Sequence, residues 1–225
     1  MNYTTLNDAT LKQKEMRTKM KNILFIQSSP RGSESYSQKV ARSIVSDLEE
    51  RYPGAKVVVR DLAQNPPPHV GEAFVGGLST GSEQRTPEQT KALALSDVLI
   101  DELLAADVIV LAVPMHNFGP PSTLKAWIDH VVRIGRTVSY SQKGPEGMLK
   151  GKRAILVLAR GGVYSDGPAK PMDFQEPYLR TVLGFIGITD IDVVPVEGLA
   201  RSAIGPEKAV ASAMARSREI LSQAV

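Results

Sequence analysis

Five short apolar runs recur along this chain, and a segment with helical periodicity follows each of them. Strands and helices that alternate in this way predict a parallel sheet with helices on both faces and right-handed connections. The expected strands span residues 22–27, 56–60, 107–113, 153–159 and 190–196. The expected helices span residues 37–51, 86–105, 122–133, 175–186 and 206–223. The predicted fold class is therefore α/β, with five βα units.

Two connections are longer than a crossover between parallel strands requires. Residues 62–85 are rich in Pro and Gly, and residues 135–152 contain the turn-like segment Gly144-Pro145-Glu146-Gly147. Long ordered connections in a compact domain are typical of binding loops or dimer contacts. Residues 1–20 are polar and are expected to form a flexible extension, followed by a single domain over residues 21–225.

Composition excludes several classes of function. The chain has no cysteine, which rules out disulfides, thiolate metal sites and cysteine nucleophiles, and its three histidines lack zinc-binding spacing, so no metal is expected. The net charge of +3 is spread among interleaved acidic and basic residues, which argues against nucleic-acid binding. No apolar run approaches the roughly 18 residues of a membrane span, and the first residues lack the apolar core of a secretory signal. We therefore expect a cytoplasmic protein.

The third expected strand ends in a small polar and aromatic loop. The unalternating run Val108-Ile109-Val110-Leu111-Ala112-Val113 is typical of a strand buried on both faces. Pro114-Met115-His116-Asn117-Phe118-Gly119 follows it directly. Ligands of open α/β sheets bind at the carboxyl ends of the strands, so this loop predicts a site for a flat, partly polar ligand.

A serine-rich loop follows the first strand. Ser29, Ser35 and Ser37 lie where this loop meets the start of a helix, whose free N–H groups and dipole favour an anion such as phosphate. The loop is neither a Walker motif nor a Gly-x-Gly-x-x-Gly dinucleotide motif. Alternatively, Ser35 and Ser37 only cap the helix.

A third loop begins with paired glycines after the fourth strand. Gly161 and Gly162 allow backbone N–H groups to approach a ligand closely, and in a sheet of this type they would face the loop after the third strand. Three loops are thus expected to converge. Trp127 is expected in the core or a dimer interface, and the adjacent Asp129 and His130 do not face each other on a helix.

Taken together and in order, these motifs resemble a known enzyme family. They comprise the serine-rich loop, Pro114-Met115-His116-Asn117-Phe118, Gly144-Pro145-Glu146-Gly147, Arg160-Gly161-Gly162 and Gly184-Phe185-Ile186-Gly187-Ile188. From about residue 21 to the C-terminus the chain is similar to the FMN-dependent NADH:quinone oxidoreductases, also called FMN-dependent NADH-azoreductases. The resemblance implies a flavodoxin-like, doubly wound five-stranded parallel sheet of order 2-1-3-4-5.

The same resemblance implies a homodimer with one FMN per subunit at the dimer interface. It also implies two-electron transfer from NADH or NADPH, by ping-pong hydride transfer through flavin N5, to quinones and aromatic azo compounds, whose azo bond is cleaved reductively. The protein itself would then supply no catalytic residue, since flavin N5 is the reacting centre.

Site residues carry over by motif. The resemblance implies cofactor contacts at Ser29, Ser35, Tyr36, Ser37, Pro114, Met115, His116, Asn117, Phe118, Ala159, Arg160, Gly161 and Gly162. It implies substrate contacts at His116, Asn117 and Phe118, and Tyr164 and Phe174 are expected walls of the substrate pocket. Two positions depart from the family pattern: His116 stands where Tyr is common and Ala159 where Ser is frequent, which affects substrate range more than FMN retention.

Two other classes of protein remain open on the sequence. A flavodoxin-type electron carrier would share the fold and FMN, but such carriers tend to be acidic, whereas this chain is slightly basic. The other class is an FMN-free binding module or a phosphatase that uses the serine-rich loop. Phosphatases of similar loop shape need a cysteine nucleophile, which the chain lacks.

Overall fold

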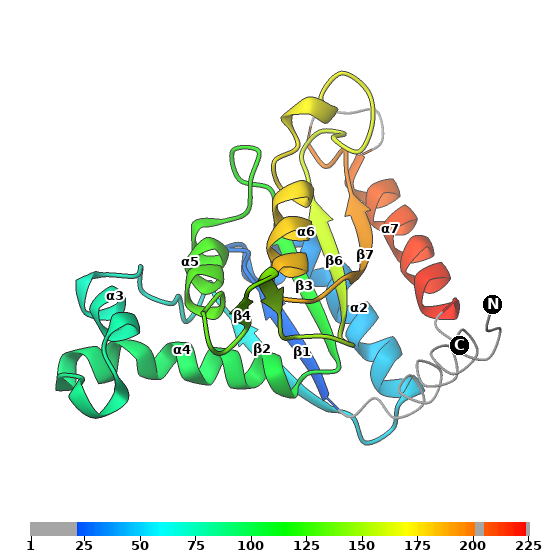
Figure 1. Ribbon diagram of the computed structural model, residues 1–225. Helices are drawn as coiled ribbons and strands as arrows, with labels where there is room; N and C mark the ends of the chain where they lie inside the picture. The colour runs from blue at the N-terminus through cyan, green and yellow to red at the C-terminus, as the bar shows by residue number, and fades with distance from the viewer. Residues whose placement is uncertain (1–21, 201–204, 224–225) are drawn as a thin grey trace, which may run out of the picture.

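The computed structural model describes residues 22–200 and 205–223, and its centre is a five-stranded parallel sheet (Figure 1). The strands lie in the order β2-β1-β3-β6-β7. Their bounds are β1 Asn22–Gln27, β2 Lys56–Asp61, β3 Val108–Pro114, β6 Arg153–Ala159 and β7 Asp190–Val196. Because β6 and β7 are the fourth and fifth strands of this sheet, the predicted order 2-1-3-4-5 is confirmed.

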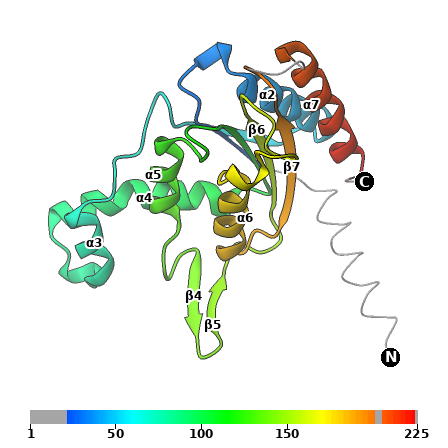
Figure 2. The same ribbon diagram turned by 90° about the horizontal axis from the view of Figure 1, so that it is seen from above.

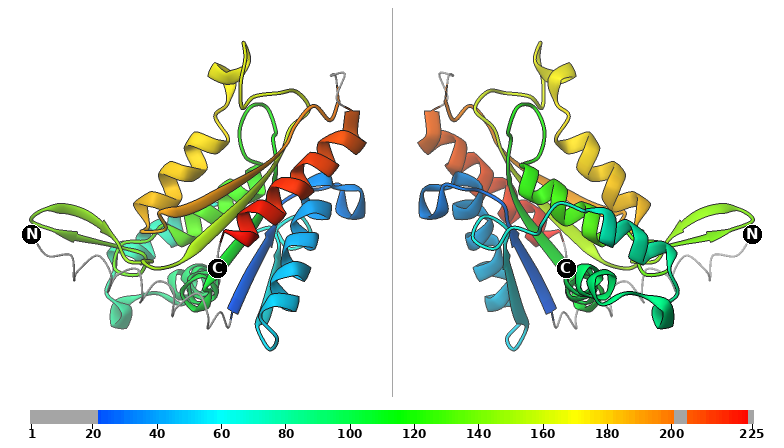
Figure 3. Two further views of the ribbon diagram at one scale, coloured as in Figure 1. Left: turned by 90° about the vertical axis from the view of Figure 1, so that its right-hand side faces the viewer. Right: turned by 90° about the vertical axis from the view of Figure 1, so that its left-hand side faces the viewer.

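Helices cover both faces of the sheet (Figure 3). One face carries α2 (Tyr36–Arg51) and α7 (Gly205–Ser222), and the other carries α4 (Pro87–Ala105), α5 (Ser122–Val131) and α6 (Glu176–Phe185). Within β1, Ile23 and Phe25 belong to the core on the α2 side, whereas Leu24 and Ile26 belong to the core on the α4 side. Both sides of the strand are buried, which explains its unbroken apolar sequence.

The long connections contain elements that were not predicted as such. Residues 62–85 include α3 (Glu72–Ser79), which lies at the outer end of α4, and residues 135–152 include the hairpin of β4 (Val138–Ser141) and β5 (Gly144–Gly147), which projects from the sheet (Figure 2). Short 3-10 turns occur at Gly32–Glu34 (η1), Ser82–Gln84 (η2) and Lys170–Met172 (η3). The predicted extension over residues 1–20 lies outside the described residues.

The hairpin is anchored by a close approach of two backbones. A Cβ atom on Gly147 would lie 2.1 Å from the backbone nitrogen of Gly187, at the turn between α6 and β7. Two residues later, the Leu149 N–H donates to the carbonyl of Ile186 at 2.8 Å. Position 147 therefore has room only for glycine, and two glycine-containing motifs far apart in sequence pack against each other.

Parallel strands bring their carboxyl ends to one edge of the sheet. In Figure 1 the loops after β3 and β6 lie above this edge. Trp127 has 1% of its surface exposed and lies in the core, which is one of the two positions expected for it. Among the helices that the structure describes, none combines the length and the apolarity that crossing a membrane requires.

Candidate functional site

The three loops singled out from the sequence lie beside one another at the carboxyl edge. Strand β3 runs between β1 and β6, with Gln27 opposite Ala112 and Pro114 opposite Ala159. The Met115 N–H donates to the carbonyl of Ala159 at 2.8 Å, so β3 and β6 stay paired up to the start of their loops. The predicted convergence follows from this strand order.

The serine-rich loop leads into the N-terminus of α2. Ser35 is the N-cap residue, and its Oγ lies 3.1 Å from Ser37 Oγ. Ser29, Ser35 and Ser37 are all buried, with at most 3% of their surfaces exposed. Within the described part of the chain, the N–H groups of Tyr36 and Ser37 have no acceptor. Helix capping is therefore part of the role of Ser35, and two donors are left for an anion.

Gln38 is a further candidate that the sequence did not single out. Its backbone N–H donates to Ser35 Oγ at 3.3 Å, which places it in the first turn of α2. Its side-chain Nε2 is buried and has no hydrogen-bond partner among the described residues. A buried amide donor without a partner costs about 1–3 kcal/mol, so this position favours a bound acceptor.

The loop after β3 is a strained two-residue turn. His116 and Gly119 exchange two backbone hydrogen bonds, at 2.9 and 3.0 Å. Between them Asn117 has φ 48° and Phe118 has φ 72°, and no other described non-glycine residue has a positive φ. A type I′ turn favours Asn first and Gly second, so Phe118 occupies a position suited to glycine. Such strain concentrates at ligand sites.

The loop after β6 presents free backbone donors. The carbonyls of Gly161 and Gly162 accept from Ala200 N–H and Gly198 N–H, both at 3.0 Å. The N–H groups of the two glycines find no acceptor among the described residues, and the same holds for those of Asn117 and Phe118. Neighbouring strand ends thus offer a set of unpaired N–H groups suited to the polar edge of a ligand.

Three aromatic residues lie close to these donors. The rings of Phe118 and Tyr164 meet edge to face, with their centroids 6.3 Å apart. The Phe174 N–H donates to the carbonyl of Phe118 at 3.1 Å. Phe118 is 42% exposed and Phe174 is 63% exposed, which is unusual for large apolar residues. The structure thus brings these three predicted substrate-contact residues together, and their roles stay predictions.

Arg160 differs from the other predicted cofactor contacts. Its side chain is fully buried and donates to Gln175 Oε1 at 3.0 Å, to Asp173 Oδ2 at 2.7 Å and to Glu197 Oε1 at 2.8 Å. Its backbone N–H donates to the carbonyl of Val196. The guanidinium is therefore already enclosed by protein groups. Ala159, also in this segment, has a small buried side chain.

Glu197 gathers several donors around one carboxylate. Burial alone would raise the pKa of Glu197, but hydrogen bonds from Ser165, Arg160 and Tyr164 N–H, together with the charge of Arg160, outweigh it and hold the pKa below its usual 4.5. Glu197 therefore stays ionised in the folded protein at neutral pH.

The remaining ionisable groups of interest lie away from this edge or have other partners. Asp129 is paired with Lys125 at 2.6 Å, while His130 Nε2 lies 2.9 Å from the carbonyl of Pro68. Asp129 and His130 thus have separate partners, as expected. Over residues 22–200 and 205–223, no group of side chains is arranged to hold a metal ion.

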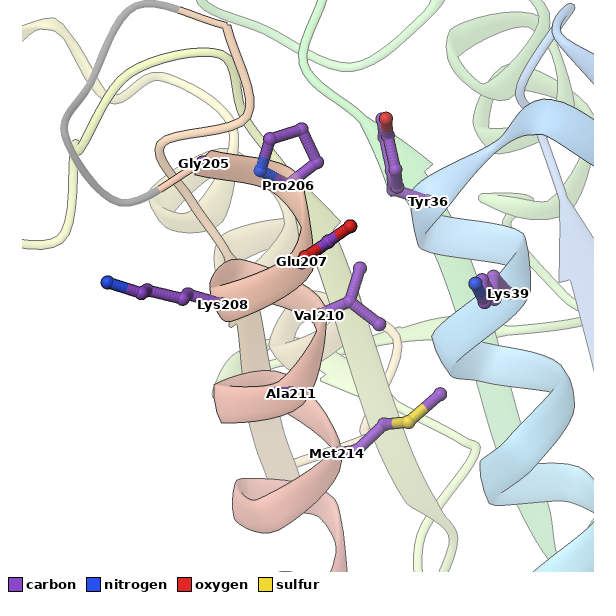
Figure 4. Close-up of a pocket in the computed structure, with 9 residues that line it drawn as sticks. All are labelled: Tyr36, Lys39, Gly205, Pro206, Glu207, Lys208, Val210, Ala211 and Met214. Atoms are coloured by element: carbon purple, nitrogen blue, oxygen red, sulfur yellow. The ribbon is translucent and has the colours of Figure 1, made fainter.

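A surface groove of about 690 Å³ runs between the starts of α2 and α7 (Figure 4). Val210 and Met214 of α7 point toward α2 there, and Tyr36 and Lys39 line the other side. Of the predicted site residues only Tyr36 lines this groove, so it borders the serine-rich loop and does not include Phe118, Tyr164 or Phe174.

Comparisons with known proteins agree with this geometry. A family model described as a flavodoxin-like fold matches residues 21–221. The FMN-dependent NADH:quinone oxidoreductase of Aromatoleum aromaticum is 53% identical over 85% of this chain and 95% of the relative. The protein of that name from Herminiimonas arsenicoxydans is 49% identical over 90% of this chain and 99% of the relative.

A solved structure, that of an azoreductase from Bacillus anthracis, superposes with a TM-score of 0.84 at 29% identity and covers 91% of this chain and 100% of that one. The five-stranded order, the converging loops and these matches over most of the sequence lead to one assignment. The chain belongs to the FMN-dependent NADH:quinone oxidoreductase family of flavodoxin-like proteins.

Proposed function

We propose that this chain binds FMN and transfers two electrons from NADH to quinones. The observation that carries the proposal is the set of backbone N–H groups without an acceptor among the described residues, in the first turn of α2 and in the loops after β3 and β6, near Phe118, Tyr164 and Phe174. Relatives that match most of the chain are named for this cofactor, donor and acceptor.

The residues present suit the two ends of FMN. At the phosphate end, Ser29, Ser35 and Ser37 offer hydroxyls, and the N–H groups of Tyr36 and Ser37 have no acceptor among the described residues. The buried and unpartnered Nε2 of Gln38 lies in the same helical turn and would find an acceptor. Uncharged donors at a helix N-terminus hold a phosphate without a compensating lysine or arginine.

At the ring end, the segments 114–118 and 159–162 would hold the flavin. The N–H groups of Asn117, Phe118, Gly161 and Gly162 have no acceptor among the described residues and can hydrogen-bond polar ring atoms. Fixed donors of this kind stabilise negative charge without reorganising. FMN, when bound, supplies the hydride chemistry at its N5.

The aromatic wall formed by Phe118, Tyr164 and Phe174 would bind the planar substrates. These rings can stack on nicotinamide or on a quinone and exclude water from the site. We infer a ping-pong sequence in which donor and acceptor occupy this one pocket in turn. Aromatic azo compounds are also planar, so we propose them as further acceptors, with the azo bond cleaved to two amines by two successive two-electron reductions that consume two NADH. His116, exposed in the same turn, would contact cofactor or substrate.

We further propose that the protein is a cytoplasmic homodimer. Phe174, Tyr140 of the hairpin and Ile134 are 63%, 60% and 71% exposed, respectively, and a second copy would bury such residues. Size measurement of the purified protein in solution tests the assembly, and a monomer with bound FMN would refute it.

The visible spectrum of the purified protein tests the function. We expect a yellow protein with one noncovalent FMN per subunit, whose colour is bleached by NADH without oxygen and restored by a quinone. The matched variant replaces Ser35 and Ser37 by Ala, which should weaken FMN by about 1–3 kcal/mol, since each lost bond to a charged group contributes about 1.5–3 kcal/mol and water replaces part of it.

Failure of FMN to bind, whether during expression or on addition, would overturn the proposal. A yellow protein that NADH leaves unbleached would instead indicate an electron carrier of the flavodoxin type. If the Ser35 and Ser37 double variant kept its FMN affinity, these serines would serve helix capping alone.

A further inference from the structure

The Arg160 cluster consists of Arg160, Asp173, Gln175 and Glu197, and it is joined to the aromatic wall through the backbone of Tyr164 and through the chain neighbours of Phe174. The Arg160 side chain has no exposed surface, and those of Asp173 and Glu197 are 9% and 10% exposed. One cation is thus enclosed by two contacting carboxylates, with the Glu176 carboxylate 3.8 Å away. Because buried charges are costly unless paired, an apolar side chain would fill this space more simply.

The cluster makes most of its remaining contacts with loop backbone near the proposed site. Glu197 Oε1 accepts from the N–H groups of Tyr164 and Ser165, each at 2.9 Å, and Glu197 Oε2 accepts from Ser165 Oγ at 2.5 Å. Glu197 therefore fixes the segment that begins at Gly161 and carries the Tyr164 ring.

The cluster also reaches the strained turn after β3. Gln175 Nε2 donates at 3.1 Å to the carbonyl of Val113, the penultimate residue of β3. Asp173 Oδ1 accepts from the N–H groups of Gln175 and Glu176, which fixes the start of α6. Phe174, which lies between Asp173 and Gln175 in the chain, donates its N–H to the carbonyl of Phe118. The ends of β3, β6 and β7 and the start of α6 are thus connected through one guanidinium.

We propose that Arg160 is a positioning residue that holds the loop at residues 161–174 and the turn at residues 116–119 in the geometry that receives the flavin. The inference rests on the proposed function, and it gives Arg160 a role other than the direct cofactor contact expected from the sequence. A preorganised site avoids ordering its loops during binding, so loss of the cluster should speed release of the cofactor.

Strands β6 and β7 supply a matched control. At their amino ends Arg153 pairs with Asp192 at 2.6 Å, and the Arg153 side chain is 14% exposed. Arg153→Met therefore breaks an arginine–carboxylate pair between the same two strands, at the edge of the sheet remote from the site. A variant that merely loosens the sheet would behave like Arg153→Met.

The test compares Arg160→Met, Glu197→Gln and Arg153→Met with the wild type. FMN release is followed by flavin fluorescence, and amide hydrogen exchange at Tyr164 and Ser165 is measured on the cofactor-free proteins. We expect FMN release to be about tenfold faster in Arg160→Met and Glu197→Gln, and their exchange at these amides to be faster as well. Arg153→Met should match the wild type in both. If Arg160→Met does not fold, Glu197→Gln decides, because it keeps the shape of the side chain.

Wild-type rates of FMN release in the two cluster variants would overturn the inference, and so would equal acceleration by Arg153→Met. A wild-type protein that takes up no FMN would refute the proposed function instead. In that case amide exchange alone decides whether the cluster positions the loop.

Discussion

Replacement of Phe118 separates backbone strain from ring contacts at the proposed site. Phe118 has φ 72°, a conformation in which an L side chain is strained and glycine is not. Phe118→Ala and Phe118→Gly both remove the ring and its contact with Tyr164. The two variants therefore differ only in the Cβ atom, whose effect depends on the backbone conformation.

Two opposing terms give the size of the difference. A left-handed conformation costs an L residue about 1–2 kcal/mol, which Phe118→Gly relieves and Phe118→Ala does not. Glycine in turn destabilises the folded state by about 0.4–1 kcal/mol relative to alanine, through the entropy of the unfolded chain. We therefore expect Phe118→Gly to be more stable than Phe118→Ala by about 0.8 kcal/mol.

The assay is urea unfolding of the cofactor-free variants, compared at equal slope so that the midpoint reports stability. Phe174 provides the control, because it is also exposed but is not among the described non-glycine residues with positive φ. There the order should reverse, with Phe174→Ala more stable than Phe174→Gly by about 0.4–1 kcal/mol. The reasoning fails if alanine is the more stable replacement at position 118 as well.

Three further predictions concern pH, packing and phosphate binding. Because the pKa of Glu197 is held below 4.5 in the folded state, its contribution to stability is present above that pH and is lost as pH falls through the folded pKa. The difference in unfolding free energy between wild type and Glu197→Gln should therefore shrink in acid, and a constant difference from pH 7 to pH 3 would contradict this. Gly147→Ala should destabilise by about 3 kcal/mol or more in thermal unfolding, because the added Cβ overlaps backbone, whereas Gly81→Ala, with open space around it, should be neutral or stabilising. Ser37→Ala leaves the N-cap residue intact and should weaken FMN binding by about half as much as the double variant, about 0.5–1.5 kcal/mol in a fluorescence titration, and unchanged affinity would remove Ser37 from the phosphate site.

The sheet could be predicted because its strands are buried on both faces. Three of its five strands, β1, β6 and β7, have the predicted bounds. Strand β2 is one residue longer than predicted, and β3 is shifted by one residue at both ends. Helix α3 was missed because it contains Gly76 and Gly77, which lower helix propensity. These glycines instead allow close packing, since a Cβ on Gly77 would lie 3.0 Å from Leu93 of α4. Strand β5 has the sequence Gly-Pro-Glu-Gly, whose residue types are depleted in strands, and it forms by pairing with β4.

The sequence predicted which loops form the candidate site. It did not predict the hydrogen bonds and ion pairs between the residues of these loops. Each loop can be recognised from its own residues: the serine-rich loop, the turn at Asn117 and the paired glycines. In any α/β sheet with this strand order, such residues after a strand indicate a binding loop. The partners of Arg160 could not be recognised in this way, because Asp173 and Glu197 are distant in the sequence and only the packing of α6 and β7 brings them to Arg160. Gln38 could have been noticed from its place three residues after the N-cap Ser35, but its missing partner is visible only in three dimensions.

The sequence by itself determined what depends on local periodicity and on chain order: the alternating strands and helices, their burial on two faces, and which loops follow which strands. Topology rules then placed three loops at one edge of the sheet. Only the tertiary structure decided which charges meet, that Gly147 lies against Gly187, and that Phe118 is held with a positive φ. These features arise from contacts between residues distant along the chain, whose energies depend on distances and burial that no local pattern contains.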